Sequence, residues 1–264
     1  MKKYMAYFRA MITSHLEYRG ALLIWMLIEL ISVGASVFIW LGIFSSSDQV
    51  GTFHVTDIIS YYFFLPIIGA FTSASVTDTL PREIRLGSIS AEIVKPYNFS
   101  YFRLAHCLGS KITQLSLKIP VYLFIGFFLW AFIQAKLNWA MLPFALIFVC
   151  LGFLMHFYFD YGLSLLAFWV EDVWSFGLLK RILLLVFGGL AFPLSLVPKS
   201  FAWIFDVLPF KFIYYFPIAI LQNNISQKEI LFSLPQILFW LMFFYIISRL
   251  LWSKGLSKYG AYGQ

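Results

Sequence analysis

Three ionisable side chains lie inside stretches of the sequence that are otherwise apolar: Glu29, His156 and Asp160. His156 and Asp160, in the segment HFYFD, are four residues apart and so share one face of a helix. Ionisable groups at membrane depth are costly and usually functional, so these residues could form a proton relay or a translocation site for a cationic substrate. The same pair could instead be an interhelical polar contact that helps assembly. Two ligands without a third do not make a metal site, and we predict none.

The sequence lacks the motifs that would let this chain catalyse a reaction. It has no G-x-x-x-x-G-K-[ST] loop, because LGSKIT at Leu108–Thr113 lacks the spacing that wraps a phosphate. It has no G-x-S-x-G, H-E-x-x-H or C-x-x-C pattern either. Cys107 and Cys150 lie in or beside apolar runs, and we expect inert core thiols. We therefore predict no catalytic residue and no cofactor in this chain.

The composition indicates a chain that is solvated by lipid. Of its 264 residues 61% are hydrophobic and only 12% are charged, and the mean hydropathy is +0.85. A soluble domain carries about 25% charged residues, and a membrane barrel would alternate apolar and polar residues along its strands. The net charge of +7 comes from basic residues that are scattered and form no stripe, so nucleic acid is not expected. The predicted fold is an all-α integral membrane protein that contacts anionic lipid headgroups.

Six segments contain the about 20 mostly apolar residues that a membrane-spanning helix needs. They run from about Ala21 to Phe44, Ile58 to Thr79, Cys107 to Ala135, Trp139 to Val170, Leu178 to Leu196 and Ile230 to Leu251. Lysine and arginine are concentrated before the first segment, between the second and third, after the fourth and after the last. The positive-inside rule therefore places both termini and the stretch Leu80–Leu104 in the cytoplasm.

The first 20 residues place apolar side chains at helical spacing among charged ones. This pattern predicts an interfacial helix that lies along the inner leaflet, with a frayed terminus as the alternative. A signal peptide is not expected, because the apolar run after these residues is longer than about 15 residues and has no small-residue cleavage site.

The connection after the fifth predicted span, residues 193–229, is apolar and aromatic but is broken repeatedly by prolines. No single helix can run through it, because proline removes a backbone hydrogen bond and clashes with the preceding turn. We predict one or two short re-entrant helices that form an external gate, or else an interfacial cap with only a packing role. The candidate gate residues are Pro193, Pro198, Pro209, Phe210 and Pro217.

The stretch Leu80–Leu104 holds six charged residues between two apolar runs. A proline near its start suits the first turn of a helix, and Gly87 and the pair Lys95–Pro96 interrupt the rest of the stretch. The pattern predicts one or two short helices that project from the cytoplasmic face. They could be a docking surface for a soluble partner or a solvated connector.

Four segments together resemble the permease subunits of type-two ABC exporters, in particular the small six-span permeases that work with a separate ATPase. They are IRLGSISAEIVKPYNFSYF, LLAFWVEDVWSF, PLSLVPKSFAWIFDVLPFKFIYYFPIAIL and the tail GLSKYGAYG. The segments occur in the same order as in the family along nearly the whole chain. The tail lacks the family's usual double glycine, so it carries no weight.

The resemblance implies that Leu80–Leu104 is a coupling region that sits in a cleft of an ATPase subunit. The residues that it assigns to this contact are Glu83, Arg85, Gly87, Glu92, Lys95 and Pro96. It also implies two ATPase copies that hold ATP and Mg, a second permease that is identical or similar, and a bacterial-type inner membrane. No nucleotide site is then expected in this chain.

The leading hypothesis is the membrane half of an ATP-driven exporter that moves an amphipathic or lipid-like compound outward. A proton-coupled secondary transporter that uses Glu29, His156 and Asp160 is the alternative, although only one broken segment is visible where that class often has two. A membrane enzyme that acts on lipid would need clustered histidines and carboxylates, and the four histidines are dispersed.

Overall fold

The computed structural model describes residues 19–46, 49, 53–130, 133, 137–170 and 174–261. The predicted interfacial helix of residues 1–20 lies almost wholly outside this part of the chain. The described elements are α2 (Arg19–Phe44), α3 (Val55–Thr72), η1 (Val76–Asp78), α4 (Leu80–Arg85), α5 (Ser90–Ile93), α6 (Phe99–Phe128), η2 (Trp139–Met141), α8 (Leu142–Leu165), η3 (Leu166–Phe168), α9 (Trp174–Phe187), η4 (Leu194–Leu196), α10 (Lys199–Val207), η5 (Pro209–Phe212), α11 (Tyr215–Leu221) and α12 (Gln227–Ala261).

Three helical segments of the described chain are long and apolar enough to cross a membrane: Val55–Thr72, Trp139–Phe168 and Gln227–Tyr259. Two shorter apolar stretches, Gly34–Phe44 and Lys118–Phe128, lie within α2 and α6. The all-α membrane fold is therefore confirmed. The count of six spans stays a prediction.

The predicted end of the second span is wrong, and two other helices extend beyond the apolar runs that were predicted to cross the membrane. The second span was expected to reach Thr79, but α3 ends at Thr72. Helix α6 begins at Phe99, well before Cys107, because the Asn98 side chain caps it by accepting hydrogen bonds from the amides of Ser100 and Tyr101. Helix α12 continues past Leu251 to Ala261.

The predicted fifth span, Leu178–Leu196, is also wrong in its extent, because α9 ends at Phe187. Gly189 lies just beyond this end with a φ of +90°, a conformation that favours glycine. Its carbonyl accepts a 2.7 Å hydrogen bond from the Tyr61 hydroxyl, and a Cβ on Gly189 would lie 2.6 Å from that oxygen. The turn after α9 is thus fixed by α3.

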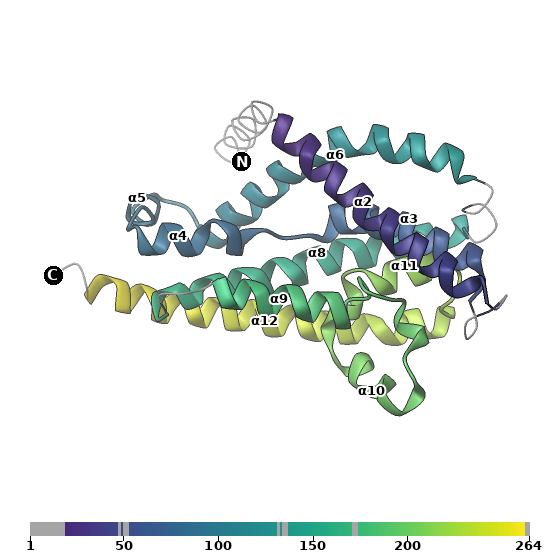
Figure 1. Ribbon diagram of the computed structural model, residues 1–264. Helices are drawn as coiled ribbons and strands as arrows, with labels where there is room; N and C mark the ends of the chain where they lie inside the picture. Colours follow the sequence, from purple (N-terminus) through teal and green to yellow (C-terminus); the bar gives the residue numbers. More distant parts are fainter. Residues whose placement is uncertain are drawn as a thin grey trace.

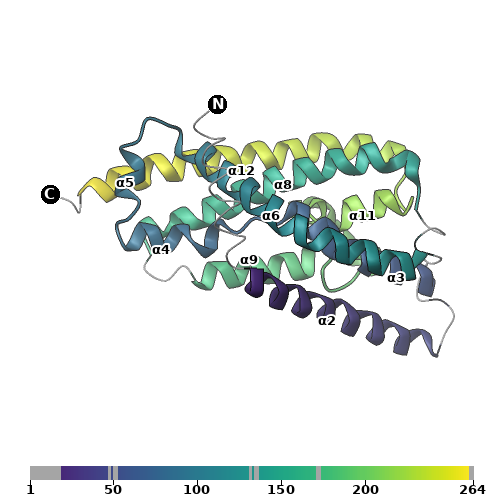
Figure 2. The same cartoon turned by 90° about the horizontal axis from the view of Figure 1, so that it is seen from above.

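Helix α8 occupies the centre of the molecule, and α12 runs along it (Figures 1 and 2). Figure 1 shows α4, α5 and the last turns of α12 at one end, with α11 toward the other. Around the α4–α5 end a core forms from buried side chains that include Leu80, Ile84, Ile89, Phe157 and Phe168. The larger core at the other end includes Tyr61, Phe148, Phe212 and Ile218.

The segment after α9 is divided into η4, α10, η5 and α11, as its prolines require. Helix α10 projects from the side of the bundle (Figure 1), and Phe201 and Trp203 are exposed on it. Helix α11 turns back, and apart from its first residue its side chains are buried against α3 and α8. The backbone N–H of Asn138, just before η2, donates a 2.9 Å hydrogen bond to the Leu221 carbonyl. This bond joins the start of η2 to the end of α11.

Gly152 allows η5 to touch α8, since a Cβ there would lie 2.7 Å from the backbone oxygen of Phe212. We expect Gly152→Ala to lower the free energy of unfolding by about 1–3 kcal/mol, because a backbone atom cannot move aside as a flexible side chain can. Thermal unfolding of the purified protein in detergent measures the change. Gly34→Ala is the matched control, since its Cβ would meet nothing within 4 Å. Equal melting temperatures for the two variants would contradict the close contact.

Candidate functional site

The α3–α4 junction, residues 73–79, connects the end of α3 to the predicted coupling region. Its backbone is irregular apart from the single turn of η1. Irregular backbone at membrane depth must find hydrogen-bond partners within the protein. Asp160 of α8 accepts hydrogen bonds from two amides of the junction, and lysines of α6 and α9 donate to two of its hydroxyls.

Asp160 of α8 is the central partner of the junction and is fully buried. Its Oδ2 accepts hydrogen bonds from the amides of Val76 at 2.6 Å and Thr77 at 3.2 Å. Its Oδ1 accepts from the Thr77 hydroxyl at 2.8 Å and from Lys180 Nζ at 2.5 Å. Lys180, on α9, also donates to the Thr77 hydroxyl at 2.8 Å. One carboxylate therefore joins the junction, α8 and α9.

Two further basic side chains, those of His156 and Lys111, contact the backbone where α3 ends. His156 Nδ1 lies 2.9 Å from the Thr72 carbonyl oxygen. Lys111 of α6 donates to the Ala70 carbonyl at 3.1 Å and to the Ser73 hydroxyl at 3.2 Å, and its Nζ lies 4.8 Å from the centre of the Phe153 ring. Each contact satisfies a backbone or hydroxyl group that α3 leaves open at its last turn.

His156 and Asp160 share a face of α8, as their spacing predicts, but His156 contacts Thr72 at the end of α3 while Asp160 bonds to the junction and to Lys180. This geometry favours the assembly role that the sequence left open, although His156 Nε2 has no hydrogen-bond partner among the described residues. Glu29 lies in α2, and its side chain is outside the described part of the structure. A translocation role for these three residues stays a prediction.

The stretch Leu80–Leu104 folds as two short helices around a turn. Gly87 has a φ of +75° and forms that turn. Leu80, Ile84 and Ile89 are buried in the core beneath it. Leu86 and Val94, by contrast, are 70% and 82% exposed. The segment therefore has an anchored inner side and an exposed outer side.

The charged residues of this stretch also fall into two groups, one bonded within the protein and one exposed at its surface. Glu83 forms a two-pronged ion pair with Arg103 at the start of α6, and Arg103 Cζ lies 4.8 Å from the centre of the Phe99 ring. Arg85 is exposed on the outer side. Of the predicted coupling residues in this helix, Glu83 thus anchors the segment, while the Arg85 side chain is exposed to solvent.

Glu92, Lys95 and Pro96 lie at the far end of the stretch. Lys95 Nζ donates to the Glu92 carboxylate at 2.7 Å, and the Tyr97 hydroxyl donates to the same carboxylate. Burial acts to raise the pKa of Glu92, but these two hydrogen bonds, together with the charges of Lys95 and Arg103, lower it below its ordinary value. Lys95 and Pro96 are exposed. A contact between these residues and an ATPase stays a prediction.

The last turns of α12 hold the α4–α5 pair, a contact that the sequence analysis missed. The Tyr259 hydroxyl lies 2.7 Å from the Ser90 hydroxyl and 3.2 Å from the Gly87 carbonyl oxygen. The Trp252 ring stacks on Phe99 with centroids 4.4 Å apart. The aromatic residues of the GLSKYGAYG tail could have suggested that the end of the chain packs against another element. Their spacing does not show that this element is the α4–α5 pair.

Of the candidate gate residues, four are buried and one is exposed. Pro193, Pro209, Phe210 and Pro217 are buried, and Pro198 is exposed at the start of α10. Phe210 stacks edge-on with Phe159 of α8 at 5.4 Å between centroids. The gate role stays a prediction. No group of three or more metal-ligating side chains occurs among the described residues.

These features define a helical membrane protein in which a short charged segment is fastened to the membrane-spanning helices. The chain matches a family model described as ABC-2 family transporter protein over residues 30–263. Since the match covers most of its length, the chain belongs to that family. Comparisons with curated proteins and with solved structures give no match. The family identifies the chain as a permease component, distinct from the ATPase that such permeases work with.

The buried Asp160–Lys180 ion pair predicts a large loss of stability when one of its two charges is removed. We expect Asp160→Asn to destabilise the fold by on the order of 3 kcal/mol, because it leaves Lys180 without a counter-charge in a buried site. Adding Lys180→Met should restore part of the loss. Thermal unfolding in detergent measures both. Glu92→Gln is the control, since its partner Lys95 is 49% exposed and stays hydrated when the carboxylate charge is removed. The proposal that Asp160 anchors the junction fails if Asp160→Asn melts like the unmodified chain.

The Tyr259 contact predicts a local effect. We expect Tyr259→Phe to raise amide hydrogen exchange of residues 87–93 about fivefold, because a lost hydrogen bond contributes about 1 kcal/mol to local stability. Mass spectrometry of the exchanged peptides measures it. Tyr101→Phe removes a hydroxyl from a side chain that is 52% exposed and should leave the exchange of residues 87–93 unchanged. Unchanged exchange in Tyr259→Phe would show that α12 does not hold the segment.

Proposed function

We propose that this chain is the permease subunit of an ABC exporter that moves an amphipathic or lipid-like compound outward. A separate ATPase subunit supplies the energy. The family match over residues 30–263 carries the proposal. The 21% aromatic content supports a substrate that is recognised by apolar surface, since aromatic side chains offer large apolar faces.

The outer side of the α4–α5 pair is the proposed contact for the ATPase. Arg85, Leu86, Val94 and Lys95 are exposed there. Apolar side chains flanked by charges suit a protein partner better than water, because burying them is favourable and the charges set the orientation. Glu83 acts by positioning, since its carboxylate is taken by Arg103.

Movement of this surface would reach the membrane-spanning helices along two routes. One runs through η1 and Asp160 to α8 and α9. The other runs through Tyr259 and Trp252 to α12. Coupling requires such a contiguous element with two arrangements that the nucleotide state of the ATPase would bias.

The proposed assembly contains two ATPase copies and a second permease, identical or similar, around one pathway. In each permease six spans would cross a bacterial-type inner membrane with both termini in the cytoplasm. The concentration of basic residues around Leu80–Leu104 supports that orientation. The segment of η4, α10, η5 and α11 would then form the external gate. ATP and Mg would be bound by the partner.

Purification of the tagged chain in a mild detergent from cells that carry its gene tests the proposal. We expect an ATPase subunit with a phosphate-binding loop to co-purify and to be identified by mass spectrometry. Vesicles that contain the complex should move a fluorescent amphipathic compound or lipid only when ATP and Mg are added on the cytoplasmic side. Transport by the chain alone on a proton gradient would overturn the proposal in favour of the secondary transporter.

The exposed apolar pair predicts a loss of assembly. We expect Leu86→Ser together with Val94→Ser to lower the amount of ATPase retained by the permease about tenfold, which corresponds to about 1.4 kcal/mol. Quantitative mass spectrometry of the purified complex measures it. Leu231→Ser is the matched control, because Leu231 is 59% exposed near the opposite end of α12. Equal retention in both variants would remove the α4–α5 surface as the contact.

A further inference from the structure

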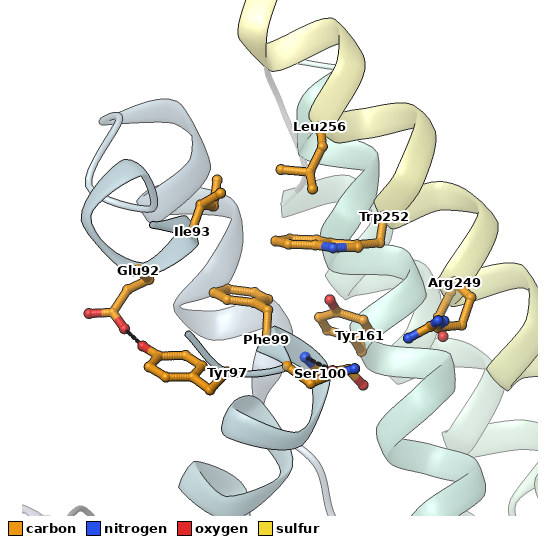
Figure 3. A pocket seen from close by; sticks show the side chains of 11 residues that line it. Glu92, Ile93, Tyr97, Phe99, Ser100, Tyr161, Arg249, Trp252 and Leu256 are labelled. Atoms are coloured by element: carbon orange, nitrogen blue, oxygen red, sulfur yellow. Dashed lines mark hydrogen bonds between the residues drawn. The ribbon is translucent and has the colours of Figure 1, made fainter. Parts of the chain in front are cut away.

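A cavity of about 190 Å³ lies at the α4–α5 end of the molecule, between α5, the start of α6 and α12 (Figure 3). Ile93 of α5 and Leu256 of α12 line it, and both are only partly buried, so the cavity can be reached from solvent. Four aromatic side chains also line it, those of Tyr97, Phe99, Tyr161 and Trp252. The wall of the cavity is therefore largely aromatic.

The cavity has room for one more aromatic ring. An apolar cavity of about 150 Å³ can hold a benzene molecule, and this one is somewhat larger. Trp252 and Phe99 already stack on one another, with ring planes that differ by 8°. Aromatic pairs are favourable beyond the area that they bury, so a ring suits this wall better than an aliphatic chain does.

The predicted membrane boundary places the cavity beyond the acyl chains of the bilayer. The last span is predicted to end at Leu251, and α12 continues to Ala261. With a rise of about 1.5 Å per residue, Leu256 lies about 7.5 Å past that end. Glu92 and Arg249 line the cavity as well, so it carries charges of both signs. A protein surface, which also carries both signs, matches this better than a lipid tail or a small ion does.

The cavity is continuous with the surface that is proposed to contact the ATPase. Ile93 lines the cavity, and the next two residues, Val94 and Lys95, are exposed. Glu92 joins the two areas, because it lines the cavity and its carboxylate accepts a hydrogen bond from Lys95. Permeases of this family work with an ATPase subunit. A partner that covers Val94 and Lys95 would therefore also reach the cavity.

We propose that this cavity receives one aromatic side chain of the ATPase subunit. The ring contacts Ile93 on α5 and Trp252 and Leu256 on α12. Aromatic anchors that fill a pocket of the partner contribute much of the binding energy at protein interfaces. The inference rests on the proposed function and deepens it, because the ATPase then holds the end of α12 as well as the α4–α5 pair.

Filling the cavity tests the proposal on the permease–ATPase complex purified in a mild detergent. We expect Leu256→Trp to lower the amount of ATPase that the permease retains about tenfold, because the added ring takes the space that the ATPase side chain needs. Ser257→Trp is the matched control, since it adds the same ring at an exposed neighbouring position that does not line the cavity. The melting temperature of the Leu256→Trp permease alone should be unchanged or higher, since filling a cavity tends to stabilise a fold.

A thiol in the wall reports whether the cavity is occupied. Cys150 is exposed, so Leu256→Cys is made together with Cys150→Ser and labelled with a charged maleimide. We expect labelling to be at least tenfold slower in the complex with the ATPase than in the permease alone. Ser257→Cys, in the same background, should be labelled at nearly the same rate in both.

Cross-linking identifies the side chain that enters. Ser253 is exposed and follows Trp252 directly, so a benzophenone maleimide on Ser253→Cys lies near the cavity. We expect mass spectrometry to find it linked to an ATPase peptide that contains a Phe, Tyr or Trp. Changing that aromatic residue to Ala should lower retention as much as Leu256→Trp does.

Several results would overturn the inference and leave the proposed function intact. They are equal retention of the ATPase by Leu256→Trp and the unmodified chain, an equal loss in Ser257→Trp, and a cross-linked peptide without an aromatic residue. Slow labelling of Leu256→Cys in the permease alone would also overturn it, because a lipid or another part of the chain then fills the cavity. The labelling and cross-linking experiments decide the question independently of any effect of Leu256→Trp on folding. Absence of an ATPase from the unmodified preparation would overturn the proposed function and the inference together.

Discussion

The buried Asp160 carboxylate fixes the α3–α4 junction against α8 and α9, and the structure around that junction depends on it. Helix α3 stops at Thr72, and the backbone between it and α4 cannot complete its own hydrogen bonds. A buried carboxylate that accepts from two backbone amides, a hydroxyl and an ammonium group supplies what the helix end lacks. Because a buried charge is costly unless it is paired, Lys180 is as necessary to this arrangement as Asp160. The α4–α5 pair follows this junction directly in the chain, and Arg103 of α6 and Tyr259 of α12 bond to that pair.

The sequence predicts the class of fold because hydropathy and charge are properties of whole segments. Residue types and their spacing predict the lipid-solvated bundle, the break at the prolines after α9 and the short helices around Gly87. Helix ends are harder to predict, since they depend on partners that are distant in the chain. The end of α9 is fixed by Tyr61, more than a hundred residues away, and the early start of α6 by the cap at Asn98.

In the candidate site, too, the sequence predicts some residues and not their partners. His156 and Asp160 stand out because charge is rare in an apolar run, and the structure confirms that they share a helical face. Their partners do not stand out: Lys111 and Lys180 look like ordinary topology signals, and Thr77 looks like a loop residue. Nothing in the spacing of Tyr259 or Trp252 shows that α12 meets the α4–α5 pair and the start of α6. Such pairings arise only when the helices pack.

Helix α12 has 35 residues and no interruption between Gln227 and Ala261, despite Pro235 within it. At 1.5 Å per residue it is a rod of about 52 Å, longer than a bilayer is thick. In its first turn Ile230 is buried in the larger core, in its fourth turn Trp240 donates a 3.1 Å hydrogen bond to the carbonyl of Val207 at the end of α10, and near its other end Tyr259 meets Gly87. A stiff rod attached at both ends cannot tilt at one without displacing the other. A displacement of the α4–α5 pair is therefore transmitted along a single helix to the core at the opposite end of the molecule.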